Sequence, residues 1–405
     1  MIKIGKVYIE HTQEQARLCA DLSLNGKGTT LWFGVKKEYA DYLCNERSDA
    51  FIMALLPAAM RGGYQIISET PMSKRLYYQI TNYLMPTMSD ISDRYKKVII
   101  DAPLDSKPIQ NKGAVGTGFS GGVDCLYSIM THGPSSQYPL THLAVFNVGA
   151  FDGEGYRQNF DSACTDSADF ATQLGLELIC LDSNIVDVLP ESFLEVYTFR
   201  NLSGAMALQG LFSVYLLSSD HAFSELTFDF SNNSTYDLLM IHSSQTESLA
   251  IYSSGGQVRR HQKLIELADW EPAQRWLHPC FRRRLKQGNC GKCKKCIYTM
   301  TILYAYRLLD RFHSVFDIDE YKRSIDHNFG YIIASQHRPL CKEALDILRK
   351  QNVHISPEAY KIASSLRANG NDANNTITEQ ADALRLIAKK LRKTKQNDKS
   401  SEDKV

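Results

Sequence analysis

The sequence predicts an α/β protein whose core is a parallel sheet with helices on both faces. From residue 113 onward, short apolar segments alternate with segments of helical character. Strands spaced by helices in this way are typical of a parallel sheet. A glycine pair stands directly between the first of these strands and the first helix, and the chain beyond residue 297 is mostly helical in pattern.

The elements of this alternation follow one another without long gaps. Such sheets bind ligands at the carboxyl ends of their strands, so we expect functional residues in the loops that follow the strands. The predicted elements are a strand at 114–119, a helix through 125–130, a strand at 143–148, a helix at 156–174, a strand at 176–181, a helix at 202–217 and a strand at 226–230.

The two ends of the chain differ from this central pattern. The first part reads as a mixed α/β extension, with a strand at 31–35 and an apolar helical stretch at 51–60 that a glycine pair ends. The last residues are polar and charged, without the apolar periodicity of a packed helix. We therefore predict an N-terminal extension at 1–108, a central domain at 109–300, a helical C-terminal region at 301–390 and a disordered tail at 391–405.

Bulk properties narrow the class of protein. The formal net charge is +1, which gives no general electrostatic reason to bind nucleic acid or an anionic membrane. The N-terminus lacks the pattern of a secretory signal, and no apolar run approaches the roughly 20 residues that a membrane helix needs. We expect a soluble, cytoplasmic protein, in which the ten cysteines form no disulfide framework.

The glycine pair lies in a segment suited to holding phosphate groups. Adjacent glycines let the backbone approach an anion closely, and the turn points several N–H groups, with the start of the next helix, at one place. Ser120 can donate its hydroxyl to a phosphate oxygen, and Asp124 could hold Mg²⁺ or orient the loop. The segment resembles the Ser-Gly-Gly-x-Asp-Ser signature of PP-loop ATP pyrophosphatases, with Cys125 in place of the final serine.

Four cysteines show the spacing of a metal site. The pattern Cys-x₉-Cys-x₂-Cys-x₂-Cys fits a closed tetrahedral Zn²⁺ site of the structural type, and an iron–sulfur cluster or a metal-free cluster remains an alternative. Gly291 eases the short turn between the second and third cysteines. The predicted metal ligands, which lie within a zinc knot at 280–296, are Cys280, Cys290, Cys293 and Cys296.

The two motifs together, in this order, resemble the 7-cyano-7-deazaguanine synthase (QueC) family over residues 113–305. The pair Arg200-Asn201, the basic segment 258–265 and the approach to the first cysteine at 276–280 add to the resemblance. The long extensions at both ends depart from a minimal synthase. They make the chain more similar to the QueC-like proteins of antiphage defence gene clusters, and they suggest a protein acceptor or partner.

The resemblance implies a PP-loop fold of the adenine nucleotide α-hydrolase type, with ATP, Mg²⁺ and Zn²⁺ as cofactors. It implies adenylation of a carboxylate, 7-carboxy-7-deazaguanine, followed by attack of ammonia or a protein amine to give an amide or a nitrile. The implied catalytic residues are Ser120, Asp124, Arg200 and Asn201. The implied ATP-binding residues are Phe119, Ser120, Gly121, Gly122, Val123, Asp124, Cys125, Phe146, Asn147 and Gly149.

Two other functions stay open on the sequence alone. PP-loop enzymes also exchange oxygen for sulfur in tRNA bases or small molecules, which would require a reactive cysteine outside the metal site, with Cys125 or Cys164 as candidates. The chain could also be a nucleotide-binding subunit without catalysis. The oligomeric state and the role of the first 108 residues are not predicted.

Overall fold

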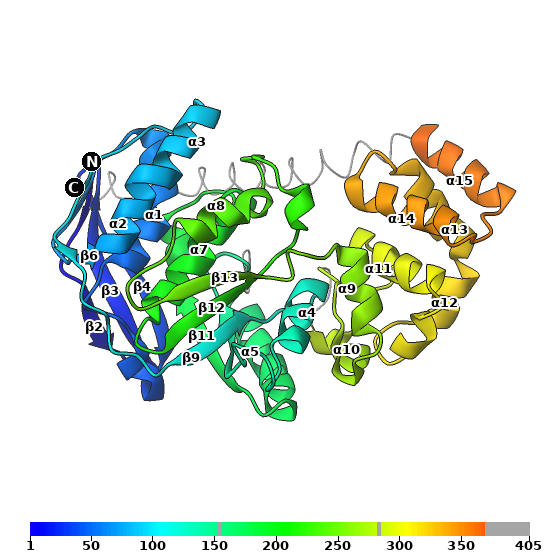
Figure 1. The fold of residues 1–405 in the computed structure, drawn as a ribbon, viewed down its shortest axis with the longest axis horizontal. Coiled ribbons are helices and arrows are strands. Elements are labelled where there is room, and N and C mark those ends of the chain that lie inside the picture. Colours follow the sequence, from blue (N-terminus) through cyan, green and yellow to red (C-terminus); the bar gives the residue numbers. More distant parts are fainter. Residues whose placement is uncertain (152–155, 282–284, 369–405) are drawn as a thin grey trace, which may run out of the picture. The chain divides into compact units, whose positions relative to one another are not determined.

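The computed structural model describes residues 1–151, 156–281 and 285–368 of the 405. The chain divides into two compact units, Met1–Cys290 and Gly291–Val405, and each is treated by itself. The first unit is mixed α/β and contains a large sheet covered by helices (Figure 1). It contains the predicted phosphate loop, residues 119–122, between β9 and α4.

The large sheet has eleven strands within the described residues, in the order β13-β12-β9-β10-β11-β4-β3-β1-β5-β7, with β2 paired to β3. The short strands β6 (Met72–Ser73) and β8 (Leu104–Asp105) pair separately. The strands of the large sheet are β1 (Ile2–Ile4), β2 (Tyr8–His11), β3 (Gln15–Leu24), β4 (Lys27–Lys36), β5 (Ile66–Ser68), β7 (Ile100–Asp101), β9 (Ala114–Gly118), β10 (His142–Phe146), β11 (Glu177–Ser183), β12 (Phe212–Ser218) and β13 (Ala250–Ser254).

Five strands form a parallel half-sheet with β9 at its centre. Strands β10 and β11 extend it on one side of β9, and β12 and β13 extend it on the other, with every neighbouring pair parallel. The strand order therefore reverses between β9 and β12. Sheets of this topology open a ligand crevice at the carboxyl ends of the two strands where the order reverses. The segment after β9 is the one with the glycine pair.

The sheet as a whole is mixed, which corrects the prediction of a parallel sheet. Strand β4 joins the edge of the parallel half by pairing antiparallel with β11, and β3 pairs antiparallel with β4. A two-residue turn at Asn25-Gly26, with φ of 52° and 87°, links β3 to β4. Positive φ at both central residues is the geometry that tight hairpins favour. A strand at 31–35, within β4, was predicted, but its pairing was not. A hairpin needs no crossover helix, so the α/β alternation gave no sign that β3 and β4 extend the sheet.

Helices cover both faces of the sheet (Figure 1). One face carries α4 (Val123–Thr131) and α5 (Tyr156–Gln173), and the other carries α1 (Asp49–Gly62), α7 (Phe193–Ala207) and α8 (Asp237–His242). The other helices of this unit are η1 (Lys37–Tyr42), α2 (Lys74–Gln79), η2 (Ile80–Leu84), α3 (Met85–Ile91), α6 (Ile185–Val188), η3 (Phe223–Glu225), η4 (Asn233–Tyr236), α9 (Arg260–Leu267), α10 (Glu271–Trp276) and η5 (Leu285–Gln287).

One predicted helix and one predicted strand are wrong. The helix expected at 202–217 ends at Ala207, and its second half forms strand β12. The strand expected at 226–230 is not a strand in the structure. The two errors have different causes. Residues 211–217 are apolar except for Ser213 and show no period that separates a buried strand from a buried helix, whereas residues 226–230 alternate apolar and polar side chains as a strand does but pair with no other strand of the described residues. The correction places a strand end, rather than a helix, beside the phosphate loop.

The second unit is helical in its described residues, 291–368. Its helices are α11 (Lys294–Ala305), η6 (Leu309–Phe312), α12 (Ile318–Arg323), α13 (Ile325–Ala334), α14 (Pro339–Lys350) and α15 (Pro357–Ala368). Gly330 lets α13 and α15 pack closely, since a Cβ there would lie 2.7 Å from a methyl carbon of Ile362. The predicted disordered tail at 391–405 lies outside the described residues.

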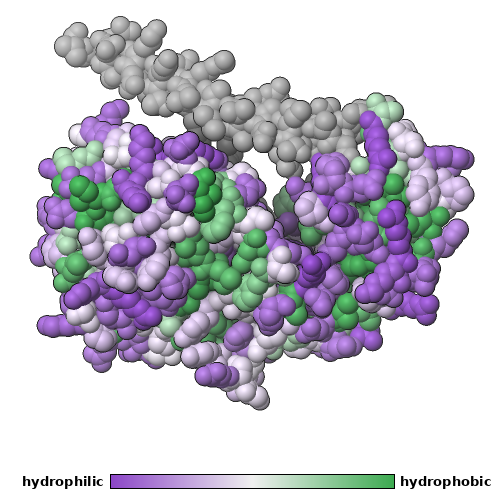
Figure 2. All heavy atoms as spheres, turned by 45° about the horizontal axis from the view of Figure 1, so that its top comes forward, coloured by the Kyte–Doolittle hydropathy of each residue, from purple (hydrophilic) through white to green (hydrophobic). Residues whose placement is uncertain are grey.

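None of the helices in the described residues combines the length and the apolarity that crossing a bilayer requires. Hydrophilic and apolar residues intermix over the face seen in Figure 2.

We predict that the N-terminal strands and the parallel half-sheet unfold together. Phe51 of α1 is fully buried and packs edge-on against Phe33 of β4, with ring centroids 5.5 Å apart, in a core that also contains Phe199 and Phe212. Phe51→Ala should lower the free energy of unfolding by about 3–5 kcal/mol. Denaturant titration followed by circular dichroism measures this. Leu194→Ala, at an exposed position, is the control and should change little. A parent-like midpoint for Phe51→Ala would contradict the shared core.

Candidate functional site

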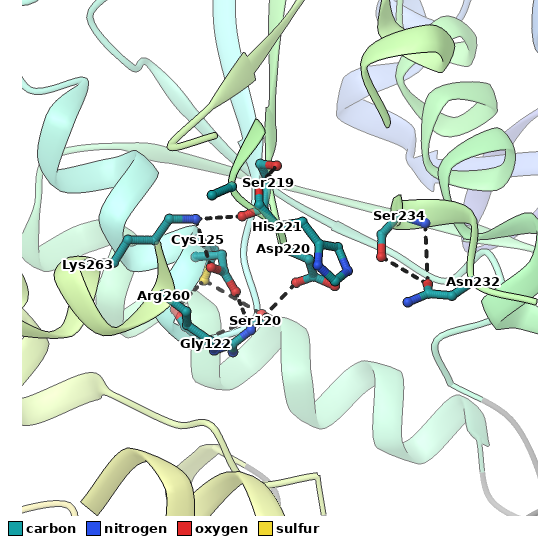
Figure 3. Close-up of polar contacts among 12 residues, drawn as sticks. Ser120, Gly122, Cys125, Ser219, Asp220, His221, Asn232, Ser234, Arg260 and Lys263 are labelled. Carbon is teal, nitrogen blue, oxygen red and sulfur yellow. Dashed lines mark hydrogen bonds and ion pairs between the residues drawn. The ribbon is translucent and has the colours of Figure 1, made fainter. Parts of the chain in front are cut away.

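The predicted phosphate loop follows the strand at which the strand order reverses. Strand β9 ends at Gly118, α4 begins at Val123, and the loop connects the two. Gly121 has φ of +71°, and a Cβ there would lie 2.7 Å from the Leu285 side chain, so the position requires glycine. Ser120 (Figure 3) is exposed, while Phe119 is buried and stacks on Phe170. The loop thus places an exposed hydroxyl beside the start of a helix.

Cys125 supports the loop from the first turn of α4. Its thiol is buried and donates to the carbonyl oxygen of Gly122 at 3.2 Å, and its sulfur lies 3.6 Å from the Ser120 hydroxyl oxygen. Burial raises the pKa of Cys125, although hydrogen bonds from Ser120 oppose the shift. The residue is therefore a protonated thiol that stabilises the turn, in the place where the PP-loop signature has serine.

Asp124 is the electrostatic centre of the site. Its Oδ1 lies 3.0 Å from Nζ of Lys263, and its Oδ2 lies 2.9 Å from a guanidinium nitrogen of Arg260. The carboxylate is buried, and the Lys263 side chain is 1% exposed. Both cations come from α9, at positions i and i+3, which lie on the same face of a helix. Asp124 therefore holds two positive charges beside the loop.

Lys263 also fixes the end of the neighbouring strand. Its Nζ donates to the backbone carbonyl oxygen of Ser219 at 2.6 Å, and the Ser219 hydroxyl donates to the carbonyl oxygen of His221 at 2.7 Å. Asp220, between them, lies 3.9 Å from Arg260. Figure 3 shows these side chains close to Ser120 and Gly122, with Asn232 and Ser234 farther away. The ends of β9 and β12 are thus tied together through one buried lysine.

The sequence prediction of the site omitted Arg260 and Lys263. The available signal was the basic segment 258–265, whose charges at i and i+3 were consistent with one helix face.

The fit of Mg²⁺ at Asp124 is poor in this arrangement, because both carboxylate oxygens already face cations and a third would be repelled. The arrangement favours the other predicted role of Asp124, which is to orient the loop.

The predicted adenine-binding segment, at the end of β10, is largely packed. Phe146 is buried and stacks on Tyr215, with ring centroids 5.8 Å apart. Asn147 is buried and donates to Asp182 at 2.6 Å, and its Oδ1 has no hydrogen-bond partner among the described residues. Gly149 has φ of +120° and leaves room for a guanidinium nitrogen of Arg200, which a Cβ would approach to 2.6 Å. The polar atom without a partner in this segment is the buried amide oxygen of Asn147.

Arg200 and Asn201 do not join the phosphate loop through any described contact. Arg200 is 2% exposed, donates to the carbonyl oxygen of Leu189 at 2.5 Å and lies 3.4 Å from the Glu191 carboxylate. It therefore lies against the end of β10 with its charge balanced. Asn201 donates to the backbone of Tyr197 within α7, at 2.8 Å.

The four predicted metal ligands come together. Their sulfur atoms all lie within 4.8 Å of one another, and those of Cys293 and Cys296 are 3.4 Å apart. Four thiolates at about 2.3 Å from one zinc ion lie about 3.8 Å apart, so this cluster can bind a metal such as zinc. Gly291, with φ of +69°, forms the turn between Cys290 and Cys293.

The segment that leads to Cys280 also contacts the phosphate loop. The backbone N–H of His278 donates to the carbonyl oxygen of Gly121 at 2.7 Å. Asn289, next to Cys290, donates to the carbonyl oxygen of Leu277 at 2.8 Å and accepts from the N–H of Cys280 at 3.3 Å. The metal-ligand segment is therefore bonded to the turn that holds the phosphate loop in place.

A disulfide, which the sequence did not predict, links Cys164 of α5 to Cys180 of β11, while the other eight cysteines, all within the described residues, form no disulfide. The two Cα atoms are 6.2 Å apart, within the range that a disulfide spans. Scattered cysteines 16 residues apart gave no sequence sign of this pairing, because only the packing of α5 on β11 brings them together.

Comparison of this chain with protein-family models, curated proteins and solved structures finds no match. Function is therefore inferred from the chemistry of the site, since a fold class alone supports many activities.

We predict that the purified chain carries about one zinc ion, because four thiolates form a closed site. Cys293→Ser should lose most of this zinc, as measured by inductively coupled plasma mass spectrometry. Cys19→Ala, which removes a buried cysteine far along the chain from the cluster, is the matched control and should keep it. Stoichiometric iron in place of zinc would contradict the zinc assignment, and parent-like zinc content in Cys293→Ser would contradict the ligand set.

Proposed function

We propose that this chain is a QueC-like, PP-loop enzyme that uses ATP to convert a carboxylate into an acyl-adenylate with release of pyrophosphate. The observation that carries the proposal is the loop 119–122, which lies where the strand order reverses between β9 and β12, with the ion pairs of Asp124 to Arg260 and Lys263 beside it. Exposed Ser120, backbone N–H groups and the start of α4 make an anion site there. The two cations beside that site would stabilise the negative charge that develops on pyrophosphate as it leaves.

In this mechanism the substrate carboxylate oxygen attacks the α-phosphorus of ATP, and the bond from that phosphorus to the β-phosphate oxygen breaks. The loop and Arg260 stabilise the negative charge that moves onto pyrophosphate, and Lys263 fixes Asp124 and the end of β12. Mg²⁺, when bound to the nucleotide phosphates, supplies further charge neutralisation. An amine then attacks the acyl carbon, an amide forms, and AMP leaves with one proton released.

The proposed carboxylate is 7-carboxy-7-deazaguanine, and the proposed amine is ammonia or an amino group of a protein. With ammonia, the resulting primary amide could be activated by a second ATP, and loss of AMP would then leave a nitrile. With a protein amine, the reaction ends at the amide, because a secondary amide cannot give a nitrile without losing its substituent. The extensions at 1–108 and beyond 300 motivate the protein-acceptor version.

Sulfur transfer fits the site less well. It would need a thiolate at the loop, whereas the thiol of Cys125 donates to Gly122 and burial raises its pKa. Cys164 is bonded to Cys180. Neither candidate cysteine is therefore poised as a nucleophile.

The test is to incubate the protein with ATP, Mg²⁺ and 7-carboxy-7-deazaguanine and to follow AMP and product mass. We expect AMP only when the deazaguanine is present, and Lys263→Met should reduce its rate by about 100-fold or more. Lys361→Met, at an exposed position of α15, is the matched control and should behave as the parent. Circular dichroism confirms that each variant is folded. Absence of AMP with every carboxylate tried would favour a subunit that binds nucleotide without catalysis.

Cys125→Ser should keep the rate of AMP formation within about threefold of the parent, because a hydroxyl can make the same hydrogen bonds as the thiol. The measurement is the initial rate at saturating ATP. Complete loss of turnover in this variant, with an intact fold, would favour sulfur chemistry and would count against the proposed reaction.

A further inference from the structure

A second polar cluster lies where α7, η4 and α8 meet. Thr198 donates its backbone N–H to Oδ1 of Asn233 at 2.7 Å and its hydroxyl to Oδ1 of Asp237 at 2.6 Å. Asn233 is fully buried, and Asp237 is 2% exposed. One oxygen of each side chain is thus fixed by the helix that follows β11.

The other half of each side chain lacks a good hydrogen bond. Oδ2 of Asp237 has no hydrogen-bond partner among the described residues. Nδ2 of Asn233 and the hydroxyl of Tyr236 interact with each other, but neither has a partner of good hydrogen-bond geometry. Leaving a buried polar group unpaired costs about 1–3 kcal/mol, so such a cluster is unusual in a structural segment. A bound ligand can supply the missing partners.

Asp237 lies within electrostatic reach of residues beside the loop. Burial raises the pKa of Asp237 well above its ordinary value, the Thr198 hydrogen bond opposes the shift, and the charge of Asp220 adds to it. Asp220 in turn lies 3.9 Å from Arg260. Tyr197, which precedes Thr198, also lies within electrostatic reach of Asp220, Asp237 and Asp124.

The unpaired atoms define the ligand that would satisfy them. Nδ2 of Asn233 needs an acceptor, and Oδ2 of Asp237, once ionised, needs N–H donors. A planar ring edge with a carbonyl, a ring N–H and an exocyclic amine side by side supplies both kinds of partner. Donors placed against Oδ2 would favour the ionised carboxylate and so reverse the effect of burial.

We infer that Asp237 and Asn233 form the subsite that binds the aminopyrimidinone edge of the substrate, with its carboxylate directed to the phosphate loop. This inference rests on the proposed function, which it extends from the reacting group to the recognised ring. The unpaired atoms are closed off from solvent without ligand, so the η4 turn has to shift when the ring enters.

The experiment measures binding rather than turnover. Isothermal titration calorimetry compares 7-carboxy-7-deazaguanine with its analogue lacking the exocyclic amine, for the parent chain, Asp237→Asn and the control Asp187→Asn, at an exposed position. We expect the parent to bind the analogue about 100-fold more weakly, because the buried carboxylate oxygen loses its partner. Asp237→Asn should bind the full compound as weakly, with a much smaller difference between the two ligands.

Asp187→Asn should bind as the parent does. Equal affinity of the parent for both compounds would overturn the inference, and so would no binding of either compound or unchanged binding by Asp237→Asn. The comparison of ligands on the parent chain needs no variant, so a folding defect in Asp237→Asn cannot hide the result. Binding with the expected pattern but without AMP formation would uphold this subsite and reject the proposed reaction.

Discussion

The site depends on the ion pair that Asp124 makes with Lys263 and Arg260. A buried carboxylate and a buried ammonium are each costly alone, and breaking such a pair by removing one partner costs about 3–5 kcal/mol. Since Lys263 also holds the carbonyl oxygen of Ser219, the pair fixes the distance between the ends of β9 and β12. The same contact therefore sets the charge beside the loop and the position of the end of β12 next to it.

The fold could be predicted where its pattern is local. The β9–α4 turn, the helical cover of the sheet and the helical second unit all follow from periodicity and glycine placement. The addition of β4 to the edge at β11 could not, because it pairs residues about 150 positions apart and leaves no local signal. Strand β12 was missed for another reason, since residues 211–217 are apolar except for Ser213 and show no clear strand period.

The candidate site was predictable to a similar degree. The spacing of the four cysteines predicts a metal site, and their sulfur atoms lie together in the structure. The partners of Asp124 could not be predicted in this way, because nothing in the sequence shows which carboxylate a basic residue pairs with. Arg260 and Lys263 follow Asp124 by 136 and 139 positions. Arg200 was predicted to be catalytic from its sequence context. In the structure it is buried, where it donates to the carbonyl oxygen of Leu189 and pairs with Glu191.

Under the proposed function, the hydrogen bond from His278 to Gly121 would couple nucleotide binding at the loop to metal binding at the cysteines. A metal that orders residues 276–280 would also order the loop, and coupling between two sites is reciprocal. A nucleotide that favours the ordered loop would then tighten metal binding by the same factor by which the metal tightens nucleotide binding. Metal supply would in this way set the nucleotide concentration at which the chain is half loaded.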